Sequence, residues 1–91
     1  MSVDRTTPGI ALEAWLDRLI VELGAEGVSA PSQAETRALL ELARVAAHAS
    51  ERIAAPLSTY LAGLALASIP AAERADRIAA LVAALEPDGS A

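Results

Sequence analysis

The sequence predicts an all-α fold, a compact bundle of about four helices. Hydrophobic residues make up 54% of the 91 residues, and about a quarter of the chain is alanine, which has the highest helix propensity. Apolar residues recur at helical spacing in four segments, which proline, glycine and serine separate. Because this length suits one small domain, we expect a single helical domain over residues 9–86, with a flexible N-terminal tail at 1–8 and a C-terminal tail at 87–91.

The first helix is predicted over residues 9–23. Thr7 can cap it, Pro8 suits its first turn, and Gly24 follows its last apolar residue, where glycine commonly ends a helix. We expect Trp15, the only large aromatic residue on its apolar face, to anchor the core. The alternative is that Trp15 is exposed and contacts a partner protein. The apolar face consists of Leu12, Trp15, Leu16, Leu19, Ile20 and Leu23.

The second helix is predicted over residues 33–54. Ser32 and Glu35 have the spacing of a capping box, in which the serine side chain accepts a hydrogen bond from the backbone of the glutamate. Pro56 is expected to end this helix, because proline inside a helix removes a hydrogen bond, and to open the next one. The inner stripe of the second helix consists of Leu39, Leu42, Ala43, Ala46, Ser50 and Ile53.

The third helix, predicted over residues 56–67, carries no charged residue and is apolar nearly all round. Such a helix is expected to be central in a bundle or buried by another subunit. Thr59, Gly63 and Ala67 form a strip of small side chains along which another helix can approach closely, so Gly63→Leu is expected to destabilise the fold. We also expect a homodimer, because a two-fold dimer is the commonest way to bury such a surface. Its predicted interface includes Thr59, Tyr60, Gly63 and Ala67.

The fourth helix is predicted over residues 70–86. Pro70 suits its first turn, and Glu73 and Arg77 are spaced for an ion pair on its surface. Its inner face, which recurs at helical spacing, consists of Ile78, Leu81, Val82 and Leu85.

Composition argues against several classes of function. The net charge of −5 at pH 7 opposes binding to nucleic acids, whose affinity for proteins depends on neutralising basic residues. The chain has no cysteine, so disulfides and thiol chemistry are excluded. The sequence begins with a polar, acidic stretch instead of a signal peptide, and we expect a cytoplasmic location. The uncharged stretch 53–72 is interrupted by two prolines, and we expect no membrane partner.

No catalytic motif is visible, so we do not expect an enzyme. The sequence lacks a glycine-rich phosphate loop, a nucleophile elbow and a zinc-binding helix motif. His48 is the only histidine, and no serine or second histidine forms an evident relay with it. His48 and Glu51 are a very weak metal signal, and neither a metal nor a cofactor is expected. A small enzyme that uses His48 is the weakest of three hypotheses.

One polar cluster is a candidate ligand site. Arg44, His48 and Arg52 are predicted to stack one helical turn apart on the second helix, next to the start of the third helix. Free N–H groups and the helix dipole at that start favour an anion, and two hydroxyls there can complete the site. This small-ligand binding domain, for a molecule that carries a phosphate, is the runner-up hypothesis. Its residues are Arg44, His48, Arg52, Ser58 and Thr59.

A simpler interpretation of the same cluster is favoured. Stripes of arginine and glutamate on a helix usually face water, and here the arginines can pair with Glu41 and Glu51. Ser58 or Thr59 then bonds only to the backbone of its own helix. His48 would be an ordinary surface residue.

Several segments resemble a known family. The resemblance covers about Leu12 to Leu85 and is most specific over Ala55–Gly63, with the sequence Ala-Pro-Leu-Ser-Thr-Tyr-Leu-Ala-Gly. The other segments that carry it are Leu12–Leu16, Glu22–Gly24, Leu42–Arg44, Ala47, His48 and Arg52. They resemble a small bacterial all-helical domain of unknown function, found alone or fused C-terminally to nucleotidyltransferases similar to the molybdenum cofactor guanylyltransferase. The chain departs from that pattern at Val45 and Ala49, where the family has an acidic residue and a glycine.

The resemblance implies an accessory role near molybdenum cofactor biosynthesis, by association with the fused enzyme, and no catalytic residues. The leading hypothesis is therefore a non-enzymatic helical accessory or interaction module, with a second copy or a nucleotidyltransferase as its protein partner.

Overall fold

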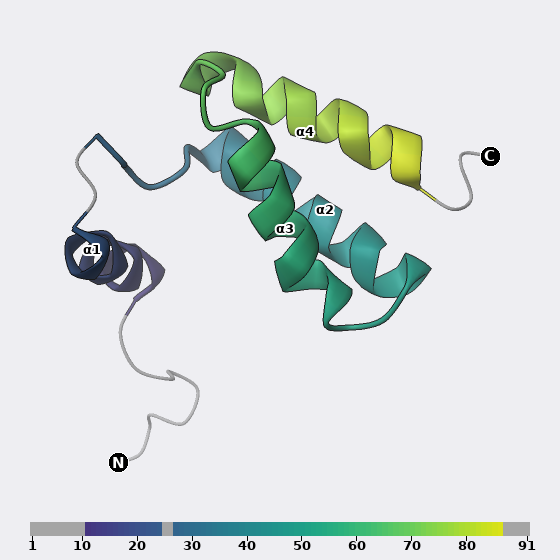
Figure 1. Cartoon of the computed structure of the whole chain (residues 1–91), viewed down its shortest axis with the longest axis horizontal. Coiled ribbons are helices and arrows are strands. Elements are labelled where there is room, and N and C mark those ends of the chain that lie inside the picture. The colour runs from purple at the N-terminus through teal and green to yellow at the C-terminus, as the bar shows by residue number, and fades with distance from the viewer. Residues whose placement is uncertain (1–10, 25–26, 87–91) are drawn as a thin grey trace, which may run out of the picture. The chain divides into compact units, whose positions relative to one another are not determined.

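The computed structural model describes residues 11–24 and 27–86, and these residues form four α-helices without a β-strand (Figure 1). The predicted all-α fold class is confirmed. The predicted tails at 1–8 and 87–91, with Thr7 and Pro8, lie outside the described residues. The helices are α1 (Leu12–Leu23), α2 (Gln33–Ala49), α3 (Ala54–Ala65) and α4 (Ala71–Leu85). None of them has the length and hydropathy that a membrane span requires.

Contacts within the chain group it into two compact units, residues 1–30 and residues 31–91. The first unit contains α1, which ends at Gly24 as predicted. Gly24 has φ 64°, a left-handed conformation that glycine adopts without steric cost. Its backbone N–H donates to the carbonyl oxygens of Ile20 and Val21, at 3.2 and 3.0 Å. These bonds satisfy carbonyl groups that the end of the helix would leave free.

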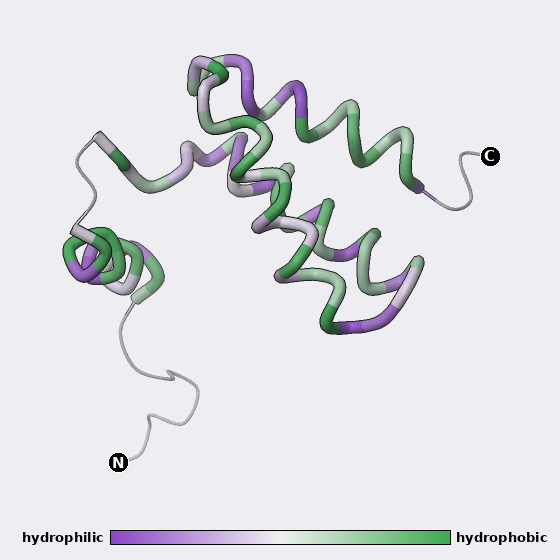
Figure 2. The backbone as a smooth tube through the Cα atoms, in the orientation of Figure 1, coloured by the Kyte–Doolittle hydropathy of each residue, from purple (hydrophilic) through white to green (hydrophobic). Residues whose placement is uncertain are grey.

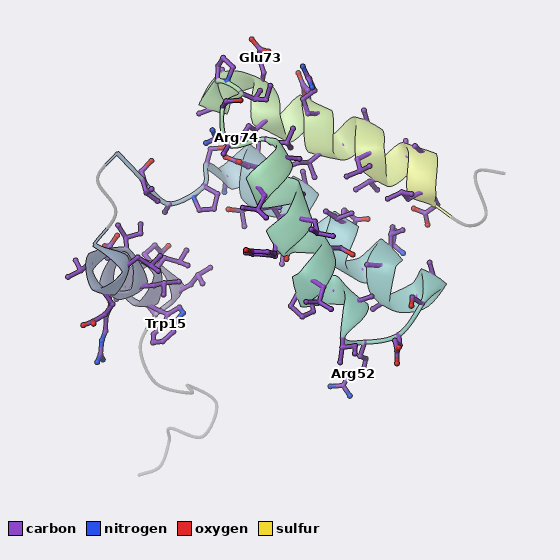
Figure 3. All side chains as sticks on the ribbon, viewed as in Figure 1. Trp15, Arg52, Glu73 and Arg74 are labelled. Atoms are coloured by element: carbon purple, nitrogen blue, oxygen red, sulfur yellow. The ribbon has the colours of Figure 1, made fainter. Side chains whose placement is uncertain are left out.

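The structure does not place Trp15 in a core. Trp15 is 49% exposed, and no residue of α1 is buried. Its side chain extends from the helix surface in Figure 3. Because α1 is the only helix among the described residues of its unit, it has no second element there against which to pack. Within the first unit, Trp15 therefore anchors no core, and its packing against the other helices stays a prediction.

In the second unit, α2 packs against both α3 and α4 (Figure 1). Its start is fixed locally, because the Ser32 hydroxyl accepts a hydrogen bond of 3.0 Å from the backbone N–H of Glu35. The predicted serine cap is thus confirmed. The inward positions of the three helices form a small core of leucine, isoleucine, valine and alanine, whose buried members are Leu42, Val45, Ala62 and Ile78.

The second helix ends at Ala49, five residues before the predicted end at Ala54. Ser50 has φ −131° and ψ −96°, which are not helical values, and residues 50–53 connect α2 to α3. Two helices that pack on each other need a connection of a few residues, and the predicted boundaries left only Ala55 for it. α3 begins at Ala54, so that Pro56 still falls in the first turn, where its missing N–H costs nothing.

Within this unit the third helix is not central, contrary to one of the two expectations for it. α2 occupies the central position in this unit, and the only buried residue of α3 is Ala62. A Cβ atom added at Gly63 would meet no heavy atom within 4 Å, apart from neighbours in its own helix. Within this unit, Gly63 therefore makes no close contact with another helix, contrary to the prediction.

An ion pair between the buried Glu35 and the half-buried Arg74 connects α4 to the start of α2. Nε of Arg74 donates to a carboxylate oxygen of Glu35 at 2.6 Å, and Nη1 donates to the carbonyl oxygen of Ile69 at 2.9 Å. Glu35 is only 7% exposed. The guanidinium of Arg74, which belongs to α4, thus binds both the first turn of α2 and the connection that precedes α4. Figure 3 shows Glu73, the neighbour of Arg74, extending away from the helices.

The predicted surface pair of Glu73 and Arg77 does not form. Among the described residues, neither side chain makes an ion pair within 4.0 Å. Both are exposed, and such pairs contribute little to stability even where they exist.

We predict that Arg74→Ala lowers the free energy of unfolding by about 2–3 kcal/mol, because it leaves the Glu35 carboxylate buried without its partner. Arg77→Ala, a matched change on the same helix at an exposed site, should alter it by less than about 0.5 kcal/mol. Urea denaturation followed by helical circular dichroism measures both. Equal losses of unfolding free energy in the two variants would show that the contact between Arg74 and Glu35 stabilises the fold no more than an exposed arginine does.

Candidate interaction surface

The surface of α3 that faces away from α2 carries four large apolar side chains. We call this surface the α3 outer face and define it by Leu57, Tyr60, Leu61 and Leu64, which are 58%, 63%, 62% and 59% exposed. Each residue turns the helix by about 100°, so these four share one side, opposite Ala62. Ala62 is 6% exposed and packs into the core with Leu42 and Ile78.

The residues of α3 explain why the large side chains lie outside. The side that contacts α2 has small residues, among them the half-buried Ser58 and Thr59 and the buried Ala62. Small side chains let two helices approach closely, while the leucines and Tyr60 fall on the opposite side. Figure 2 shows α3 without any strongly hydrophilic residue along its length. No charged residue therefore interrupts the α3 outer face.

An apolar surface of this kind is unusual in a folded unit. Single exposed leucines are normal, but several on one helix face without charges typically mark a protein contact. Burial stabilises by roughly 25 cal/mol per Å² of apolar surface, so covering four such side chains is a substantial driving force for association. The α3 outer face is accordingly the candidate interaction surface of this unit.

α1 has an apolar face of its own. The apolar side chains of α1 lie at the predicted helical spacing. Every residue of α1 is half-buried or exposed. An isolated helix of 12 residues is marginal in water, so its apolar face needs packing to stay folded. The largest exposed side chains of this stripe are Leu12, Trp15, Leu19 and Leu23.

The predicted anion cluster is not assembled as expected. The guanidinium of Arg44 donates to the carboxylate of Glu41 at 2.9 Å and to that of Glu86 at 3.3 Å. It is therefore already paired with two carboxylates. The hydrogen bond to Glu41, together with the charges of Glu41 and Glu86, raises the pKa of Arg44 above its ordinary value. His48 is exposed in the last turn of α2. Arg52 lies in the connection beyond the helix and extends away from it in Figure 3, so the predicted stack of three is wrong.

The start of α3 offers few donors to an anion. The N–H groups of Ala54 and Ala55 donate to the carbonyl oxygens of Glu51 and Arg52, at 2.8 and 3.1 Å, and Pro56 has no N–H. The Thr59 hydroxyl lies 3.0 Å from the carbonyl oxygen of Pro56 and 3.2 Å from that of Ala55, within its own helix. Ser58 is half-buried and lines a hollow of about 220 Å³ against α2. Anion binding at this junction stays a prediction without a prepared set of donors.

Other sites offer no clearer chemistry. A groove of about 330 Å³ between α2 and α4 is lined by alanines and by Arg37, Glu41 and Asp76. Positively and negatively charged side chains both border this groove, so it favours neither anions nor cations. Within residues 11–24 and 27–86, no three acidic or histidine side chains gather closely enough to hold a metal ion.

Comparison with known families agrees with a small helical domain. The model of a family described as "Domain of unknown function (DUF6457)" matches residues 7–90. The chain belongs to the DUF6457 family. A search among curated proteins finds no match, and neither does a search among solved structures.

Sequence reasoning missed the roles of Glu35 and Glu86 in this DUF6457 domain. The sequence explains Glu35 only as part of a capping box, whereas its carboxylate binds Arg74, 39 residues along the chain. The sequence predicts Glu86 only as the last residue of the fourth helix, whereas its carboxylate reaches Arg44. A glutamate at the third position of a helix, such as Glu35, is explained by capping of that helix alone. The sequence therefore gives no sign that its carboxylate binds a distant arginine.

We predict that Leu61→Ala in this DUF6457 domain changes the free energy of unfolding by less than about 0.5 kcal/mol in dilute solution, because Leu61 is mostly exposed. The same change at Leu42, which is 2% exposed, should cost about 2–5 kcal/mol. Chemical denaturation at low micromolar protein concentration compares the two. A large loss at Leu61 would mean that the α3 outer face is part of the core.

Proposed function

We propose that this DUF6457 domain is a non-enzymatic helical accessory module that binds a protein partner through the α3 outer face. The observation that carries the proposal is the set of four large apolar side chains, each more than half exposed, on a helix without charges. Leucine and tyrosine on a helix face are typical anchors of the core of a protein interface, which is depleted of charged residues.

The proposed setting is molybdenum cofactor guanylylation. The support is the resemblance to domains that are fused to nucleotidyltransferases similar to the guanylyltransferase. That resemblance is most specific over residues 55–63, and this segment includes Leu57, Tyr60 and Leu61 of the α3 outer face. The segment with the most specific resemblance thus contains three of the four residues that a partner would contact. The partner we propose is a nucleotidyltransferase of this class.

We predict that the purified chain binds a purified molybdenum cofactor guanylyltransferase with a negative heat capacity change, because apolar surface is buried. The double variant Leu57→Gln and Leu61→Gln should lose this binding and keep its helical content. Isothermal titration calorimetry at several temperatures, with the chain at low micromolar concentration, measures both. The proposal is contradicted if no heat of binding appears, or if the double variant binds as well as the original chain.

A further inference from the structure

We draw no further inference here: the strongest candidate, the exposed apolar side of α1 around Trp15, carries nothing, because nothing in the structure shows what covers it.

Discussion

The packing of α3 on α2 through small side chains is the constraint on which the rest of this structure depends. Ala62 enters the core beside Leu42 and Ile78, and the close approach leaves Leu57, Tyr60, Leu61 and Leu64 on the other side. Since α2 is already shared between α3 and α4, the second unit has no further helix for that side. Within the second unit, the α3 outer face is thus left uncovered, and the proposed function rests on that exposure.

The polar interactions of the second unit hold this arrangement in place and leave the outer face unaffected. Arg74 connects Glu35 at the start of α2 with the carbonyl oxygen of Ile69 before α4. At the other end, Arg44 of α2 reaches Glu86 just after α4. Both pairs join α2 to α4, so α3 depends on apolar packing alone. The helix that carries the candidate surface is therefore the one least restrained by charge.

Local features of the sequence were sufficient for part of the fold. Ser32 and Gly24 act on neighbouring backbone groups, so the start of α2 and the end of α1 were predictable. The end of α2 could not be predicted in this way, because the connection at residues 50–53 depends on how α3 packs against α2. Likewise, a helix that is apolar all round has no pattern to show which side meets α2, so the sequence predicts a close contact at Gly63, where this unit has an open position.

The central claim is that the α3 outer face is a free protein surface in the dilute chain and becomes covered by association. Solvent paramagnetic relaxation of leucine methyl groups, measured by NMR without and with the guanylyltransferase, tests it directly. The account predicts that Leu57, Leu61 and Leu64 relax strongly in the chain alone and are protected in the complex, while Leu42 is protected in both. Protection of all four leucines in the dilute chain alone would contradict it, because the face would then be covered within a single chain.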